Sequence, residues 1–416
     1  MGTESPSKRP SATSQAPPLD LEARLRRVGQ DLSSTLPALL ETLGSSSWRP
    51  GDLAKRLGVN RAVTSKLLAA MAKPNPMEVL HLIPGPEPLR KVLAAVDAGG
   101  GTSASADASS AASVAIEAFA ELIDEEAGTR PALEALIAPH LPGAAGKLEL
   151  ASRYSIYRGM SQLKGAQAEL WLGTAVVVPS PTDPERLDLT WLSGAHAIQR
   201  LRPMVDVRFS YRLHRGGADP DHPPEPSILS LERFCLLPMA RLETHTAGES
   251  IQYTLPDDLL GPKARTDLFV VDHHPASMRR YAGPEAVAAG RTRTSLFVEP
   301  AIPVARLQFD VLLHDDVFPG ADPELFFYDT GNDGIANVND RTRDLDRVTM
   351  VDRPELLGHG LERFGTAGLS TYGPMLAHLA EHFGWDGARL RGYRLSQGYP
   401  VHGWQTSMAF RQPAAP

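Results

Sequence analysis

The chain has 416 residues, a formal net charge of −7 and only 6% aromatic residues. This length predicts two or three domains, each able to bury its own core. The single cysteine, Cys235, excludes a disulfide framework within one chain and any cysteine-based zinc cluster. No apolar run is long enough for a transmembrane helix, and the first residues lack the apolar stretch of a signal peptide. We therefore expect a protein of the reducing cytoplasm with no membrane partner.

The N-terminal segment divides into a tail and a helical region. Residues 1–18 are rich in Ser, Pro and Thr and contain almost no apolar side chain, which predicts a disordered tail. From residue 19 to 43 leucines recur at helical spacing, which predicts one or two helices that cover the segment after them.

The stretch from Trp48 to Met71 carries the sharpest functional signal. Leu53, Ala54 and Leu57 form the buried stripe of a short helix, and Gly58 permits a tight turn. Asn60 is a suitable N-cap for the next helix. The apolar side chains of that helix share one face: Val63, Leu67, Leu68 and Met71.

This run resembles the helix-turn-helix of winged-helix transcription regulators of the IclR and MarR kind, with LAKRLGV as the supporting helix and NRAVTSKLLAAM as the recognition helix. The resemblance implies a winged helix-turn-helix domain over residues 19–96 that binds double-stranded DNA. We expect a wing strand around Val79–Ile83, followed by a closing helix from Pro88 to Val96.

Charge supports a nucleic-acid function for this stretch. Between Arg49 and Lys91 there are eight Lys and Arg residues and three Asp and Glu residues, within an acidic chain. The residues predicted to contact DNA are Arg49, Lys55, Arg56, Asn60, Arg61, Thr64, Ser65 and Lys66. The alternative is an ordinary helical hairpin, because Leu-Ala-x-x-Leu-Gly also occurs in enzymes.

Beyond this region the composition changes twice. Residues 97–112 are rich in Gly, Ala and Ser, which predicts a flexible linker and a domain boundary. Residues 113–137 and 144–163 have helical periodicity. These helices would either pair two protomers or pack on the chain's own β domain.

Residues 113–416 predict an α+β domain of mainly antiparallel sheet with a few helices. Leu170–Val178 is a continuous apolar run, and four further segments alternate apolar and polar residues as strands with one wet face do: 205–213, 251–255, 307–313 and 404–410. A weak internal repeat joins residues 238–272 to residues 303–329, and it suggests a duplicated β unit.

Metal-dependent catalysis is the rival interpretation. Asp272-His273-His274 resembles a motif of the DHH phosphoesterases, but the candidates for a second motif, His214, Asp219 and Asp221, have the wrong spacing. An aspartate that ends a strand and starts a turn explains Asp272 better.

Two further polar clusters could be interpreted as metal sites. His314-Asp315-Asp316 suits a turn or an N-cap, and the loop of Asn332, Asp333, Asn337, Asn339 and Asp340 lacks the spacing of a calcium loop. We predict no metal, no cofactor and no catalytic residue.

Four residues near the C-terminus suit a small-molecule pocket: Tyr393, Tyr399, His402 and Trp404. The sequence as a whole predicts a DNA-binding transcriptional regulator, a homodimer, whose α+β domain binds a small-molecule or protein effector. The alternatives are a metal-dependent hydrolase in the C-terminal region and a winged helix that binds protein.

Overall fold

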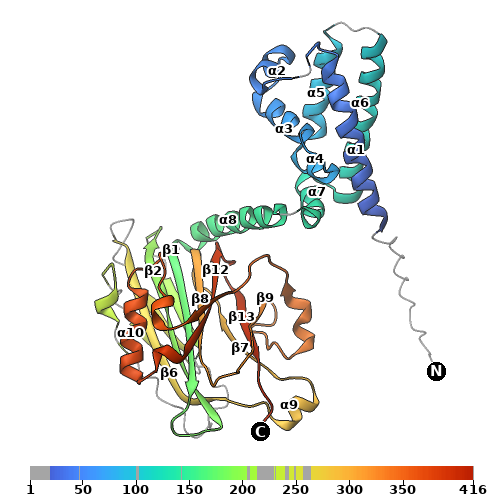
Figure 1. Ribbon diagram of the computed structural model, residues 1–416. Coiled ribbons are helices and arrows are strands. Elements are labelled where there is room, and N and C mark those ends of the chain that lie inside the picture. The colour runs from blue at the N-terminus through green and yellow to red at the C-terminus, as the bar shows by residue number, and fades with distance from the viewer. Residues whose placement is uncertain are drawn as a thin grey trace, which may run out of the picture. The chain divides into compact units, whose positions relative to one another are not determined.

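The computed structural model describes residues 19–45, 47–99, 103–141, 143–203, 207–212, 229, 231–238, 243–247, 250–255 and 264–415. The predicted tail, residues 1–18, lies outside this range. The chain forms two compact units, residues 1–148 (unit 1) and 149–416 (unit 2), shown in Figure 1. Among the described residues, no helix is both long and apolar enough to cross a membrane.

Unit 1 is a bundle of helices around one apolar core, in which Leu32, Leu67 and Phe119 are fully buried (Figure 1). Its elements are α1 (Leu19–Glu41), α2 (Pro50–Leu57), α3 (Arg61–Met71), α4 (Pro76–Leu82), α5 (Pro86–Asp97), α6 (Ser103–Leu122), a π-helical turn (Ile123–Ala127), α7 (Arg130–Ile137) and a 3-10 turn (Ala138–His140). Helix α8 (Ala144–Lys164) runs across the boundary between the units. The helices predicted over residues 113–137 and 144–163 are therefore confirmed.

The predicted wing strand at Val79–Ile83 is wrong, because these residues lie in and at the end of helix α4. Asn75 caps the helix by accepting a hydrogen bond from the Met77 amide, and Pro76 occupies its first turn. The described residues of unit 1 contain no strand. Helix α4 packs closely on α1, because a Cβ at Gly29 would lie 2.3 Å from the carbonyl oxygen of Pro76.

The flexible linker predicted at residues 97–112 is also wrong where the structure describes it. Helix α5 extends to Asp97, and α6 already begins at Ser103. Ala112 is fully buried in the core of unit 1, and Ser109 donates a hydrogen bond to Asp97. Alanine is the strongest helix former and its small side chain allows close packing, so a composition that suggested a linker forms a core helix instead.

Unit 2 is built on two large β-sheets. A six-stranded sheet has the order β11-β12-β8-β1-β2-β6, and a four-stranded sheet has the order β10-β9-β13-β7. Strand bounds in the first are β1 (Ala166–Pro179), β2 (Arg186–Arg200), β6 (Thr266–Arg279), β8 (Val304–His314), β11 (Glu355–His359) and β12 (Leu390–Gly398); in the second they are β7 (Arg293–Val298), β9 (Glu324–Asp329), β10 (Arg347–Val348) and β13 (Trp404–Arg411).

A smaller three-stranded sheet, β3-β5-β4, is formed by β3 (Val207–Arg212), β4 (Glu243–Ala247) and β5 (Ser250–Leu255). After α8, the described residues of unit 2 also form the helices α9 (Pro284–Ala288) and α10 (Tyr372–Phe383), with 3-10 turns at Glu232–Phe234, Arg341–Asp346, Leu361–Arg363 and Gly387–Arg389. The chain as a whole is therefore α+β, as predicted.

The six-stranded sheet is covered on both faces. One face shares an apolar core with the four-stranded sheet, and this core includes Trp191, Phe309 and Phe410. The other face carries α10, as Figure 1 shows. Tyr372 and Leu376 of this helix are fully buried. Pairing is antiparallel except between β1 and β8, which run parallel. The predicted wet face of residues 307–313 is wrong, because a helix layer buries it.

The predicted duplication is not supported by the topology. The first copy, residues 238–272, ends in β6 at the edge of the six-stranded sheet. The second copy, residues 303–329, ends in β9 inside the four-stranded sheet, between β10 and β13. Equivalent segments therefore have different partners, and the similarity reflects only the common pattern of apolar strands.

A buried ion pair joins the layers under α10. Asp310 of β8 is fully buried, and the guanidinium of Arg394 on β12 donates to its carboxylate at 2.6 Å and 2.9 Å. The hydroxyl of Tyr372 donates to the same carboxylate at 2.7 Å and lies 2.9 Å from the Thr174 hydroxyl. The network thus ties three strands to the covering helix.

The core position of Ala112 is testable. Ala112→Asp places an unpaired carboxylate in the core of unit 1, and we expect it to lower the free energy of unfolding by about 3 kcal/mol. The matched control is Ala111→Asp, at an exposed position of the same helix, which should leave stability nearly unchanged. Urea unfolding followed by far-UV circular dichroism measures both, and equal stability of the two variants would contradict the helical assignment.

The buried ion pair gives a second prediction. Arg394→Met leaves the Asp310 carboxylate without its cation, so we expect unit 2 to lose about 3–5 kcal/mol of unfolding free energy. Removing both charges in Asp310→Leu/Arg394→Met should restore most of this loss. Tryptophan fluorescence reports the transition because Trp171, Trp191, Trp385 and Trp404 lie in unit 2. A double variant no more stable than the single one would refute the explanation.

Candidate functional site

Helices α2 and α3 form a helix-turn-helix joined by residues 58–60. Gly58 ends α2 with a φ of 64°, a left-handed conformation that favours glycine, and the Val59 amide donates to the carbonyl of Ala54 at 3.1 Å. Asn60 then caps α3, because its side-chain oxygen accepts from the Ala62 amide at 2.8 Å. Leu53, Leu57 and Leu67 bury the inner faces of both helices.

Thr64 is placed differently from the prediction. Its side chain is 0% exposed, and its hydroxyl lies 2.7 Å from the carbonyl oxygen of Pro50 and 3.0 Å from that of Arg61. The hydroxyl therefore connects the first turn of α2 with the first turn of α3. The prediction that Thr64 contacts DNA is wrong, since it is one of the side chains that hold the two helices together.

The other predicted DNA-contact residues are exposed on the surface of unit 1: Arg49, Lys55, Arg56, Asn60, Arg61, Ser65 and Lys66. Within the described part of the chain, the five cations among them form no ion pair. Lys73 and Arg90 of the same basic segment differ, because Lys73 pairs with Glu78 at 3.2 Å and Arg90 pairs with Glu87 and Glu117.

A surface depression of about 790 Å³ lies beside the turn. Three cations and a single carboxylate, Asp52, are among its lining residues, which are Arg49, Pro50, Gly51, Asp52, Ala54, Lys55, Gly58, Val59 and Arg61. The depression therefore brings three positive side chains together beside the N-terminus of α2, where the helix dipole favours negative charge. This is a favourable setting for a phosphate group.

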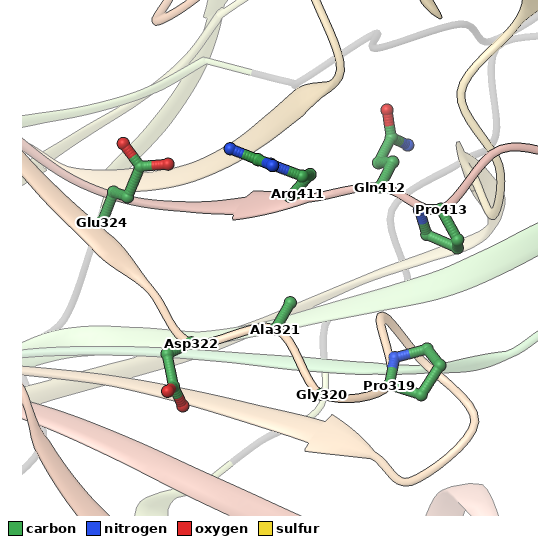
Figure 2. Close-up of a pocket in the computed structure, with 8 residues that line it drawn as sticks. All are labelled: Pro319, Gly320, Ala321, Asp322, Glu324, Arg411, Gln412 and Pro413. Carbon is green, nitrogen blue, oxygen red and sulfur yellow. The ribbon is translucent and has the colours of Figure 1, made fainter.

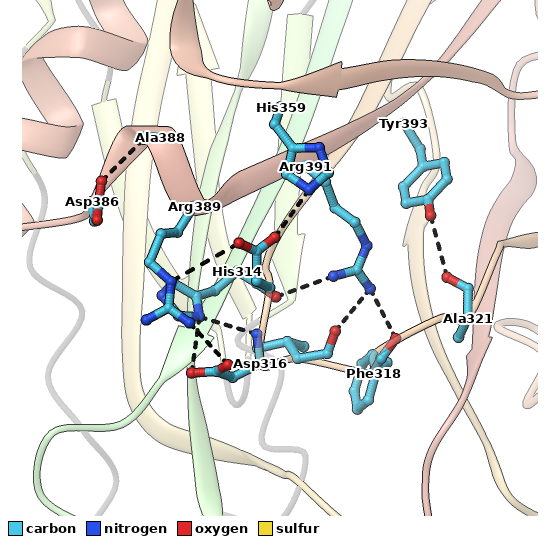
Figure 3. Close-up of polar contacts among 12 residues, drawn as sticks. His314, Asp316, Phe318, Ala321, His359, Asp386, Ala388, Arg389, Arg391 and Tyr393 are labelled. Carbon is cyan, nitrogen blue, oxygen red and sulfur yellow. Dashed lines mark hydrogen bonds and ion pairs between the residues drawn. The ribbon is translucent and has the colours of Figure 1, made fainter.

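In unit 2, Tyr393 is buried rather than available to a ligand. It is 5% exposed, packs in the core between the two large sheets, and donates a hydrogen bond from its hydroxyl to Asp322 at 3.1 Å (Figure 3 draws its contact with Ala321). Burial raises the pKa of its phenol. The prediction that Tyr393 binds an effector is wrong.

The other three residues of that prediction have separate partners. Tyr399 lies against Tyr154 and Tyr157 of α8, with ring centroids 4.9 Å and 5.2 Å away. The imidazole of His402 lies 3.0 Å from the carbonyl oxygen of Pro300, and burial lowers its pKa. Trp404 packs on the core between the sheets. A role for these three in effector binding stays a prediction.

A depression of about 430 Å³ near Tyr393 was not anticipated from sequence. Figure 2 shows the loop after β8 on one side and the end of β13 on the other, with Arg411 above the depression. Glu324 on its wall pairs with Arg293 at 2.9 Å. No sequence motif marks it, because its walls meet only through the pairing of β9 with β13.

The Asp272-His273-His274 motif lies in the middle of strand β6 and not at a turn. The side chains of Asp272 and His274 lie 2.9 Å apart. The His273 ring shares a hydrogen bond of 2.8 Å with the Thr190 hydroxyl and stacks on Phe383. Burial lowers the pKa of His273. The turn explanation for Asp272 is therefore wrong. The residues considered for a second motif, His214, Asp219 and Asp221, lie outside the described residues.

His314, Asp315 and Asp316 belong to a network of ion pairs at the end of β8 (Figure 3). His359 lies 3.0 Å from Asp315, and Arg389 donates to Asp316 at 2.9 Å. The residues that the structure describes include no group of three or more His, Cys, Asp or Glu side chains arranged to hold a metal ion. The loop that contains Asn339 and Asp340 is held by its own hydrogen bonds. The Asn339 side chain donates to the Arg293 carbonyl, and Asp340 caps a 3-10 turn.

Comparisons of this chain with protein-family models, with curated proteins and with solved structures give no significant match.

The role of the Thr64 hydroxyl gives a third prediction. Thr64→Val keeps the shape of the side chain but leaves the Pro50 and Arg61 carbonyls without this donor, so we expect unit 1 to lose about 1–2 kcal/mol of stability. Thr64→Ser retains the hydroxyl and serves as the control, with a smaller loss. Urea unfolding followed by circular dichroism compares them, and a valine variant as stable as the serine variant would argue against the hydrogen bonds.

Proposed function

We propose that the chain is a DNA-binding transcriptional regulator in which α3 enters the major groove of duplex DNA. Asn60, Arg61, Ser65 and Lys66 then face bases or phosphates. Arg49, Lys55 and Arg56 contact the phosphate backbone from α2 and its N-terminal side. The proposal gives no base or phosphate contact to Thr64.

The observation that carries the proposal is the positive surface around the helix-turn-helix, whose cations form no ion pair with any residue that the structure describes. Its five cations are Arg49, Lys55, Arg56, Arg61 and Lys66, and each is exposed. In a chain of net charge −7, such a local concentration of cations attracts a polyanion selectively to one place. The exposed hydroxyl of Ser65 adds a hydrogen-bonding group to the same surface.

Unit 2 has the second role in this proposal, the binding of a small-molecule or protein effector. A dimer of the chain would present two helix-turn-helix units to two half-sites, and the effector would change their spacing. One helix-turn-helix without a wing makes few contacts, so dimerisation raises affinity and specificity. The proposal places the protein in the cytoplasm, because a single cysteine cannot form a disulfide within one chain.

A protein-binding role for the helix-turn-helix is the second candidate. The replacement of the expected wing strand by α4 favours it, because the contact that a wing makes beside the minor groove is missing. A protein partner would use the same exposed surface but would not show the steep salt dependence of binding to duplex DNA.

The experiment that tests the proposal is selection of duplexes from a random pool by the full-length chain, repeated at several salt concentrations. The full chain is needed because α6 (Ser103–Leu122) supplies core residues to unit 1, so a fragment ending near residue 100 would lack them. Enrichment of one sequence with a steep salt slope supports the proposal. Enrichment no greater than that of a basic control protein would refute it.

A charge exchange gives the fourth prediction. Lys66→Glu places a carboxylate at the centre of the exposed face of α3, and we expect it to weaken binding to the selected duplex by about tenfold or more. Lys147→Glu changes the net charge equally at an exposed site on α8 and should leave affinity nearly unchanged. Fluorescence anisotropy measures both. Equal losses for the two variants would show that only the overall charge matters.

A further inference from the structure

The outward face of α3 carries an unusual set of short side chains. Ala62, Ser65, Lys66 and Ala69 are exposed and recur at the spacing of one helical face. Lys66 is the long side chain among them, and it lies between two alanine methyl groups along the helix.

The packing of α3 determines that this face, and no other, points outward. Thr64, Leu67 and Ala70 are fully buried on the opposite side, and the Thr64 hydroxyl is bonded to the first turn of α2. Rotating the helix would expose Leu67 and break this bond. A ligand that approaches this face of α3 therefore meets two methyl groups, one hydroxyl and one ammonium group, with the exposed Arg61 at the start of the helix.

In the major groove this set of groups has specific partners. The C5 methyl of thymine is the apolar group that a base presents there, and alanine side chains make apolar contact with it. Lysine donates to O6 and N7 of guanine. Short side chains at residues 62, 65 and 69 also let the helix backbone approach the base edges closely.

We propose that α3 selects a guanine flanked by thymines, with Lys66 donating to the guanine and the methyl groups of Ala62 and Ala69 packing on thymine methyl groups. Ala62 and Ala69 are about 10 Å apart along the helix axis, so both thymines fall within one half-site of about four base pairs. This inference rests on the proposed function, because it specifies which sequences the same surface binds.

The test uses the wild-type full-length chain and the duplex that selection yields. Each thymine is replaced in turn by deoxyuridine, which lacks the C5 methyl but keeps every hydrogen-bonding group. We expect replacement of a contacted thymine to weaken binding about fourfold, the effect of exposing one methyl group. Thymines elsewhere in the duplex should be insensitive. Replacing the contacted guanine with 7-deazaguanine, which lacks N7, should weaken binding by the wild type but not by Lys66→Met, whose side chain has no hydrogen-bond donor.

A variant assigns the contact to one side chain. In Ala69→Gly the protein methyl group is absent, so the uracil penalty should disappear at one thymine position and remain at the other. Ala94→Gly, the same change at an exposed position of α5, should retain both penalties. Because the penalty is a ratio measured within each variant, the loss of helix stability caused by glycine cancels.

Two results separate this inference from the proposed function. If the protein selects a duplex but no uracil or 7-deazaguanine replacement alters affinity, or if the selected site contains no thymine, the inference is overturned and DNA binding stands. If the wild type selects no duplex at all, the proposed function fails and the inference fails with it.

Discussion

The packing of α2 against α3 is the constraint on which the rest of unit 1's functional surface depends. A left-handed Gly58 makes the turn short, and the buried hydroxyl of Thr64 then links the first turns of both helices through the carbonyls of Pro50 and Arg61. With these contacts in place, the apolar side chains face the core and the cations face outward. The same packing brings cations of both helices to one depression, because Arg49, Lys55 and Arg61 all line it. Thr64, which the sequence predicts to contact DNA, therefore supports the exposed residues around it instead.

In unit 2 the main constraint is the burial of polar side chains. Its six-stranded sheet is covered on one face by a second sheet and on the other by α10, so polar side chains on its strands must find partners inside the protein. Asp310 does so through Arg394 and Tyr372, and Asp267 does so through His196 and the amides of residues 197, 236 and 237. Burial acts to raise the pKa of Asp267, but these hydrogen bonds outweigh it and the pKa is lowered. Internal pairing of this kind stabilises charged groups that the sheet packing removes from water.

The charged side chains of unit 1 and unit 2 differ in their partners. Among the described residues, the cations of the helix-turn-helix are exposed and have no acidic partner, whereas Asp315 and Asp316 at the end of β8 pair with His359 and Arg389. A local concentration of exposed cations attracts negative charge, and the DNA-binding proposal rests on this property. Helix α4 stands where the sequence predicts a wing strand, so the DNA-binding proposal includes a dimer, which doubles the number of contacts.

Short-range patterns in the sequence determined the elements whose environment is local. The α2-turn-α3 unit, helix α8 and strands β8 and β13 follow from spacing, capping residues and turn glycines within about ten residues of chain.

Only the tertiary structure decided the rest. Val79 and Leu80 suit a strand or a helix equally, and packing on α1 selected the helix. Residues 103–112 suggest a linker by composition, yet neighbouring helices give Ala112 a core to enter. The direction of Thr64, the burial of Tyr393 and the parallel pairing of β1 with β8 likewise depend on segments far apart in the chain, whose meeting no local pattern records.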